Sequence, residues 1–137
     1  MLDIHFNLLA PLTARVVSEL ISSGLVRSAH DVSDGGLLCA VAEMLIAGNS
    51  ERSLIGASLD LSPVHADAAV AAFSESPSRY VLEVTPSAVA AVQSQCAKHG
   101  VECAHIGTLD SSARLRARGL DIDVPTLARA WLTPLDW

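Results

Sequence analysis

The run from Asp31 to Gly36 constrains the fold of this chain more than any other stretch. It reads Asp-Val-Ser-Asp-Gly-Gly, and these residue types favour turns because Gly adopts left-handed backbone while Asp and Ser bond their own main chain. Residues 25–30 before it suit a short strand, and residues 37–47 after it suit a helix. The sequence therefore predicts a strand that passes through a tight turn into a helix.

The predicted helix carries signals at both ends. Ser33 or Asp34 can cap its start, and Gly48 followed by Asn49 gives the expected stop. The free N–H groups at a helix start attract anions, so a phosphate could approach the main chain beside the paired glycines. Three interpretations of the turn stay open at this point: an anion site, a divalent cation held by its two carboxylates, or a capped helix with no ligand.

Helices and strands alternate along the rest of the chain. Further helices are predicted at 7–23, 64–72, 85–100 and from Pro125 onward, and further strands at 54–61, 79–84, 101–106, 113–118 and 120–124. The last two strands flank Gly119 and predict a hairpin. We therefore expect one domain over residues 1–137 with an α/β or α+β fold, a layered mixed sheet with helices packed on it.

Composition excludes several classes of function. Half of the 137 residues are hydrophobic and 18% are charged, which excludes a disordered chain. Acidic residues outnumber basic ones by 15 to 9, and the only Arg cluster is Arg114, Arg116 and Arg118, so no nucleic-acid partner is expected. No apolar run approaches the roughly 20 residues that span a bilayer, and no membrane partner is expected. Three cysteines without a Cys-x-x-Cys pair fit a reducing cytoplasm.

The segment from Ser28 to Leu37 resembles the AIR-synthase-related C-terminal domain found in the synthetase subunit of phosphoribosylformylglycinamidine synthase. The resemblance covers nearly the whole chain and continues through residues 42–44, 55–61, 73–84, 106–107 and 127–131. Thiamine-monophosphate kinase has a similar turn that contains a single Gly, and AIR synthase has a Thr-Gly-Gly-Gly sequence at this place. The doubled Gly and the Ser-Glu-Ser segment therefore favour the synthase, and the motif resembles the second of its two C-domains.

This resemblance implies a part of an ATP- and Mg²⁺-dependent cytoplasmic ligase of purine biosynthesis. ATP would phosphorylate the amide oxygen of formylglycinamide ribonucleotide, and ammonia from a glutamine amidotransferase component would displace the phosphate. The family holds ATP mainly in an N-terminal AIR-synthase-like domain, which these residues do not contain, so the chain alone is expected to be inactive. The alternatives are a non-catalytic interaction module of the same assembly and a domain of a related kinase such as thiamine-monophosphate kinase.

The turn and the polar link before residues 79–84 supply candidate ligand or phosphate contacts, whereas no catalytic residue is predicted and the metal ligands stay open. The predicted contacts are Asp31, Ser33, Asp34, Gly35, Gly36, Ser74, Glu75, Ser76 and Arg79. The serines and Glu75 could equally turn the chain into the strand that follows. The amides of Gly36, Leu37 and Leu38 are expected to lie open to an anion at the helix start.

Pairing of single charged residues is less constrained by the sequence. Arg79 is predicted to pair with Glu43, the alternatives being a solvent-facing Glu43 and a pair between Arg79 and Glu75. The alternating arginines at 114–118 are predicted to line a solvated sheet edge, the alternative being contact with an acidic neighbouring domain. His30 is expected to be a hydrogen-bonded structural residue and Cys39 a core residue. A chain this apolar is also expected to expose a face for self-association or for a missing domain.

Overall fold

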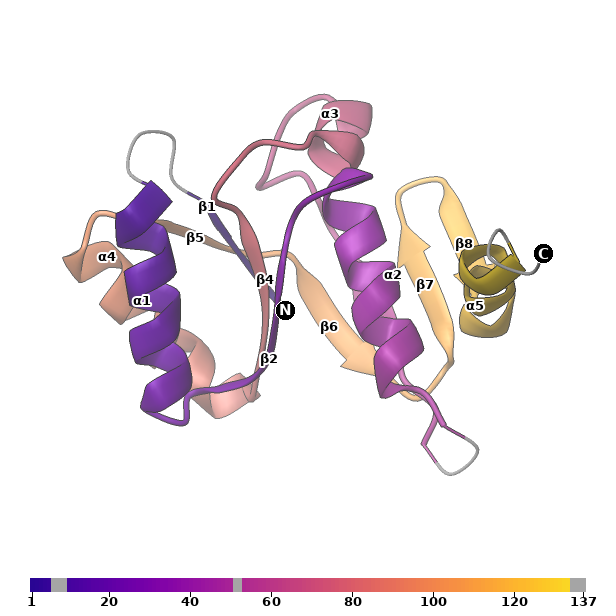
Figure 1. Cartoon of the computed structure of the whole chain (residues 1–137), viewed down its shortest axis with the longest axis horizontal. Coiled ribbons are helices and arrows are strands. Elements are labelled where there is room, and N and C mark those ends of the chain that lie inside the picture. Colours follow the sequence, from indigo (N-terminus) through magenta and orange to yellow (C-terminus); the bar gives the residue numbers. More distant parts are fainter. Residues whose placement is uncertain (6–9, 51–52, 134–137) are drawn as a thin grey trace.

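The structure is a computed structural model that describes residues 1–5, 10–50 and 53–133 (Figure 1). The element order is β1 (Leu2–His5), α1 (Ala10–Ser22), β2 (Val26–Asp31), α2 (Gly36–Gly48), β3 (Gly56–Leu59), α3 (Ala68–Phe73), β4 (Tyr80–Val84), η1 (Pro86–Ala88), α4 (Val89–Lys98), β5 (Glu102–His105), β6 (Gly107–Asp110), β7 (Arg114–Ala117), β8 (Leu120–Asp123) and α5 (Val124–Leu132). The predicted mixture of helices and strands is confirmed, and the predicted helix start at 7–9 lies outside the described residues.

The expectation of one sheet is wrong, because the described strands form two sheets of four. The first sheet has the order β2-β4-β1-β5 and the second the order β6-β3-β7-β8. The chain crosses between them at Ile106, which separates β5 from β6. A Cβ on Gly107 would collide with the backbone oxygen of Ser58, so only glycine lets β6 start this close to β3. Strands β1 and β6 were not predicted from the sequence, because their four-residue length leaves little periodicity to detect.

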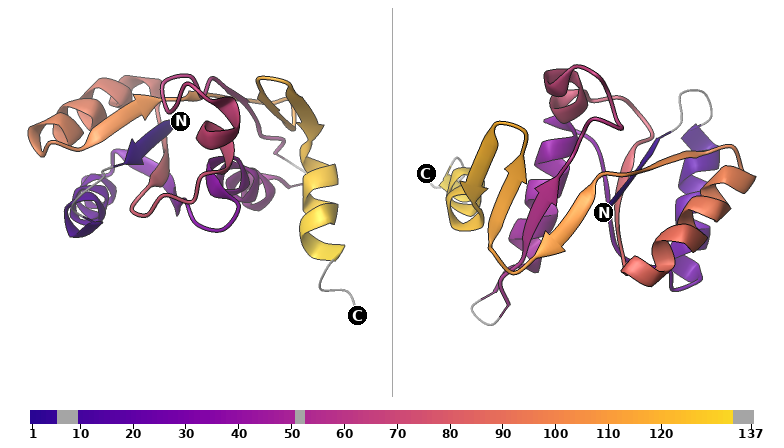
Figure 2. Two further views of the ribbon diagram at one scale, coloured as in Figure 1. Left: turned by 90° about the horizontal axis from the view of Figure 1, so that it is seen from above. Right: turned by 180° about the vertical axis from the view of Figure 1, so that it is seen from behind.

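The described residues form two apolar cores, one on the first sheet and one that also includes Val81 of the first sheet beside residues of the second. Helices α1 and α4 pack on the first sheet through Val16, Leu20, Val92 and Cys96, all of which are buried. Helix α2 packs on the second sheet, where Leu37, Val41 and Leu45 meet Ala57 and Leu115. Figures 1 and 2 show α1 and α4 at one side of the molecule, α5 at the other and α2 between them. Helix α2 therefore stands where the two halves meet.

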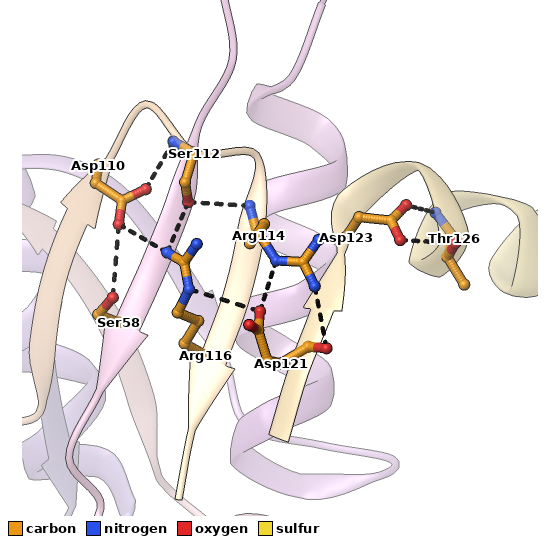
Figure 3. A network of polar contacts seen from close by, with 8 residues as sticks. All are labelled: Ser58, Asp110, Ser112, Arg114, Arg116, Asp121, Asp123 and Thr126. Carbon is orange, nitrogen blue, oxygen red and sulfur yellow. Dashed lines mark hydrogen bonds and ion pairs between the residues drawn. The ribbon is translucent and has the colours of Figure 1, made fainter. Parts of the chain in front are cut away.

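The hairpin at Gly119 is confirmed, but the predicted arginine edge is wrong. Strand β7 lies inside the second sheet, paired with β3 in parallel and with β8 antiparallel. Arg114 Nε lies 2.6 Å from Asp121 Oδ1, and Arg116 Nη1 donates to Ser112 Oγ at 3.0 Å (Figure 3). Arg116 also lies 3.5 Å from Asp110 Oδ2 and 3.5 Å from Asp121 Oδ1, so carboxylates on β6 and β8 neutralise two of the three arginines. Exposed pairs of this kind stabilise a fold only slightly.

Two short helices begin at an aspartate that caps them. Asp123 Oδ1 accepts from Thr126 N–H at 2.9 Å, and Asp67 Oδ1 accepts from Ala69 N–H at 2.8 Å (Figure 3 shows the first). Backbone N–H donation to the carboxylate lowers the pKa of both aspartates below the ordinary value of 3.8. A lowered folded-state pKa means that the caps contribute stability above pH 3.8, which is lost as the pH falls through the folded value.

We therefore expect the free energy of unfolding to fall on acidification from about pH 5 to pH 3. Urea denaturation followed by circular dichroism at several pH values measures this dependence. The variant Asp123→Asn keeps a capping oxygen but does not titrate, so its stability should fall less steeply with acid than that of the parent chain. Parallel acid dependence in the two proteins would show that this cap is not a source of the pH effect.

Candidate functional site

Two segments far apart in the sequence meet at one end of the first sheet. Strands β2 and β4 are antiparallel neighbours, and Asp31 pairs with Tyr80. The turn that leaves β2, residues 31–36, therefore lies beside the link that enters β4, residues 74–79. Figure 1 shows this meeting point beside α3 and the start of α2. All nine predicted contact residues belong to these two segments, which we call the candidate site.

Direct hydrogen bonds join the two segments. Gly35 N–H donates to Glu75 Oε1 at 2.8 Å, and Val32 N–H donates to Arg79 O at 2.8 Å. Arg79 is only 4% exposed, and its Nη1 donates to Ser74 O at 3.2 Å and Ser74 Oγ at 3.0 Å. The buried guanidinium therefore shapes the 74–79 link. Glu75 bonds the opposite segment through Oε1, and its alternative pair with Arg79 stays a prediction.

The paired glycines are required by backbone conformation and by packing. Gly35 and Gly36 have φ angles of 80° and 75°, in the left-handed region that glycine adopts at little cost. A Cβ on Gly36 would lie 2.6 Å from the carbonyl carbon of Phe73, and one on Gly35 would collide with Cys39 Sγ. The doubled Gly thus lets the start of α2 press against the end of α3.

The predicted side-chain cap on α2 is wrong. Gly35 occupies the N-cap position, and no side-chain cap bond is made there by the residues the structure describes. Ser33 contributes through its backbone instead, since its carbonyl accepts from Gly36 N–H at 3.0 Å. The left-handed turn at Gly35 places the side chain of Asp34 elsewhere, and this side chain is left exposed.

The expectation that three amides lie open to an anion is also wrong. Gly36 N–H is already bonded to Ser33 O, Leu37 is 0% exposed and Leu38 is 8% exposed. The neighbouring amide of Gly35 is bonded to the Glu75 carboxylate. Because a helix N-terminus is the positive end of the helix dipole, this carboxylate occupies the place predicted for an external anion. The protein supplies its own negative charge at the start of α2.

The nine predicted residues divide by exposure. Asp31, Ser33, Asp34, Glu75 and Ser76 are exposed, Gly35 and Ser74 are half-buried, and Gly36 and Arg79 are buried. The exposed group can reach a ligand without rearrangement of the backbone. The buried pair can act only by holding the two segments in place. Ligand contact by any of the nine stays a prediction.

A histidine outside the predicted contact set is held at the edge of the site. His30 Nε2 lies 2.8 Å from Glu43 Oε2, and His30 Nδ1 lies 2.6 Å from Asp31 O. Both partners are oxygen acceptors, so either neutral tautomer leaves one contact without a proton. Glu43 therefore has His30 as a partner, and its predicted pair with Arg79 stays a prediction. The sequence could have predicted the pair of His30 with Glu43. A helix that runs back along β2 places its second turn, which includes Glu43, near the end of that strand, where His30 lies.

Beside this pair, α2 and the first sheet border an apolar groove of about 540 Å³. Met44, Ile55, Leu109 and Trp131 line it, together with His30. The indole of Trp131 is 54% exposed. Other large apolar residues at the described surface are Ile21, Leu54, Val70, Phe73 and Leu132. An apolar surface is therefore present as expected, and its association with a partner stays a prediction.

The described residues include no group of three or more His, Cys, Asp or Glu arranged to hold a metal ion. Asp31 and Asp34 are exposed carboxylates and can supply one or two oxygen ligands. Burial raises the pKa of the Cys39 thiol, with Glu43 and Glu75 adding to the effect. The thiol is therefore protonated at neutral pH, which disfavours a nucleophilic role.

The model of a known protein family matches this chain over most of its length. Residues 4–119 match the family model described as AIR synthase related protein, C-terminal domain. The chain belongs to this family. The resemblance inferred from the Asp31–Gly36 turn is therefore confirmed.

Curated members similar to the chain are phosphoribosylformylglycinamidine synthase subunits PurL. The chain is 39% identical over 120 residues to PurL of Rhodopseudomonas palustris strain TIE-1, covering 85% of this chain and 16% of that protein. It is 38% identical over 124 residues to PurL of Thermobifida fusca strain YX, covering 88% of this chain and 15% of the relative. The chain thus spans about one sixth of the length of these relatives.

Solved structures support the fold. A Thermotoga maritima PurL complexed with FGAR aligns with a TM-score of 0.74 and 22% identity, covering 87% of this chain and 21% of that one. A PurL of the same organism complexed with ATP aligns with a TM-score of 0.73 and 23% identity, covering 85% and 21%. At this identity the similarity establishes the family's C-domain fold and leaves ligand contacts to be tested.

The contact between Gly36 and Phe73 can be measured against a matched glycine. Gly119 has φ +77° and would have no atom within 4 Å of an added Cβ, whereas Gly36 has φ +75° and the Phe73 backbone against it. We expect Gly119→Ala to cost about 1 kcal/mol from backbone strain. Gly36→Ala should cost about 2 kcal/mol more, because the backbone of α3 has to shift. Equal losses in urea denaturation would contradict the packing role.

Proposed function

We propose that this chain serves as a C-terminal domain of a phosphoribosylformylglycinamidine synthase of the PurL type, and that the candidate site contributes to its nucleotide or phosphate binding. The observation that carries the proposal is the convergence of residues 31–36 and 74–79, joined by the bond from Gly35 N–H to Glu75. These are the two segments in which the sequence predicts ligand contacts. The PurL relatives support the assignment.

The proposed reaction joins nitrogen to carbon at the expense of ATP. The amide oxygen of formylglycinamide ribonucleotide attacks the γ-phosphorus of ATP, and ADP leaves. Ammonia then adds to the activated carbon, and phosphate departs to give the amidine. This chemistry depends on holding phosphates and neutralising their charge. The exposed hydroxyls of Ser33 and Ser76 are the donors that the candidate site offers for this purpose.

Mg²⁺ fits the candidate site only together with phosphate oxygens. The described residues lack a three-ligand cluster, but Mg²⁺ commonly takes one or two carboxylates and receives its other oxygens from phosphates and water. Asp31 and Asp34 are the exposed carboxylates available for this role. When bound, the ion would supply positive charge between these carboxylates and the phosphates, which otherwise repel each other.

The proposed partners are the other parts of the enzyme. The chain spans about one sixth of the curated relatives, so an N-terminal AIR-synthase-like domain is expected to complete the nucleotide site. A glutamine amidotransferase component would deliver ammonia, and one aligned structure is that of PurLQS from Thermotoga maritima. None of the described helices has the length and apolar character needed to cross a membrane. The apolar groove bordered by Trp131 offers a surface for the neighbouring domain.

A non-catalytic role in the same assembly is the second candidate function. It is favoured by the way Glu75 and Phe73 occupy the start of α2, since both contacts give the Gly-Gly turn a purely structural reason to exist. The kinase alternative gains no such support, because the relatives described above are synthase subunits. Ligand titration and activity separate the two remaining roles.

The first test concerns competition between Glu75 and an external anion. Titration of the ¹⁵N-labelled chain with ADP and Mg²⁺, followed through the amide of Gly35, measures binding at the turn. We expect Glu75→Gln to strengthen binding about two- to fivefold, because it removes a negative charge from the helix N-terminus. Glu19→Gln on α1 is the matched control and should bind as the parent does. An unmoved Gly35 amide in all three proteins at millimolar ligand would favour the structural role.

The second test concerns activity. The purified chain should neither hydrolyse ATP nor form the amidine, because the family resemblance places most ATP contacts in another domain. In the complete polypeptide, Asp31→Asn should lower kcat/KM at least about tenfold by removing a charged ligand, whereas Asp121→Asn on β8 should not. Turnover by the chain alone that is abolished in Asp31→Ala would overturn this assignment.

A further inference from the structure

A second cavity lies between α3 and the turn that joins β7 to β8. Figures 1 and 2 show both elements at the same end of the molecule. The cavity has a volume of about 370 Å³, and Leu38, Leu61, Ala72 and Leu120 give it an apolar lining. None of the nine residues of the candidate site lines it. Pockets that bind small organic molecules have volumes from about 300 Å³ upward and mostly apolar walls.

Arg118 lines this cavity as an unneutralised cation. It is exposed beside Gly119 and makes no hydrogen bond or ion pair with any residue that the structure describes. Its neighbours on β7 differ, because Arg114 pairs with Asp121 and Arg116 with Asp110. A guanidinium presents five N–H donors in a planar fork that matches a carboxylate. The free arginine is therefore the natural anchor for an anionic group.

One acidic residue of the lining limits the charge that the cavity accepts. Asp60 lines it, and Oδ1 of this residue accepts from Ser62 N–H at 2.9 Å. Asp67 lies nearby in the chain, but its Oδ1 accepts from Ala69 and Val70 N–H at the start of α3. A lining with one exposed arginine and one aspartate suits a singly charged anion better than a dianion such as a phosphate monoester. Apolar walls require that this anion carry an apolar body.

His65 adds a hydrogen-bond donor to the lining. Its Nδ1 accepts from Asp67 N–H at 3.0 Å, which places the proton of the neutral ring on Nε2. The Nε2–H group is then available to a ligand oxygen. The arginine and the N–H donor match the anionic group of a singly charged ligand, and the apolar lining matches its apolar body.

We propose that this cavity binds a small organic monocarboxylate, with the carboxylate on Arg118 and the apolar body against Leu61, Ala72 and Leu120. The assignment goes beyond the proposed synthase role and does not depend on it. The site would let a small acid bind next to α3, the helix whose end packs against Gly36 in the candidate site. The ligand class follows from the lining alone.

Titration of the ¹⁵N-labelled chain with benzoate at constant ionic strength tests the proposal. Saturable shifts are expected in the amides of residues 60–72 and 117–120. Benzyl alcohol, which has the same ring without the charge, should bind these residues about five- to tenfold more weakly, as expected for the loss of a charge-assisted hydrogen bond. Absence of saturable shifts at these residues at millimolar benzoate, or shifts confined to other residues, overturns the proposal.

Variants separate the anchor from the apolar wall. Arg118→Gln should weaken benzoate binding about five- to tenfold and leave benzyl alcohol unaffected, whereas Arg27→Gln, an exposed arginine on β2 outside this cavity, should change neither. Ala69→Leu adds bulk at an exposed lining position of α3 and should weaken both probes. Amide spectra that match the parent outside the cavity confirm that each variant is folded. Unchanged benzoate affinity in Arg118→Gln would refute the assignment of the anchor.

Discussion

The close contact between Gly36 and the backbone of Phe73 is the constraint on which the arrangement around α2 depends. It sets the start of α2 against the end of α3, and a methyl group there would lie 2.6 Å from a carbonyl carbon. With this contact made, residues 74–79 pass beside residues 31–36, and Glu75 reaches Gly35 N–H. The candidate site thus depends on packing between two helices as well as on strand pairing. Its two segments converge because Asp31 of β2 pairs with Tyr80 of β4 and because the end of α3 packs against the start of α2.

Charge at the helix ends follows a common pattern in this domain. Asp67 and Asp123 cap α3 and α5, and Glu75 bonds the turn before α2, so each of these helices begins beside a carboxylate of the protein. Carboxylates at these positions interact favourably with the helix dipole. The same arrangement explains why an external phosphate at the start of α2 would have to displace the Glu75 carboxylate or bind beside it. Arg118 is the contrasting case, a cation at a turn without a described partner.

Local signals in the sequence predicted much of the fold. The Gly-Gly turn, the hairpin at Gly119 and the helix that starts beside Pro125 were found because Gly and Pro restrict the backbone within a few residues. The single sheet was wrong because pairing of β3 with β7, more than fifty residues apart, leaves no local trace. The prediction that the arginines lie on an edge strand was wrong for the same reason. Short strands gain their stability from partners that a linear pattern does not reveal.

The same division holds for the candidate site. The sequence by itself determined the turn at residues 31–36 and the family that carries it, because turn chemistry and the Asp-Val-Ser-Asp-Gly-Gly motif are properties of adjacent residues. Only the tertiary structure decided that Glu75 occupies the start of α2, that Leu37 is closed to solvent and that His30 pairs with Glu43. These contacts join residues from different elements, and burial and hydrogen-bond partners arise only when the elements pack together.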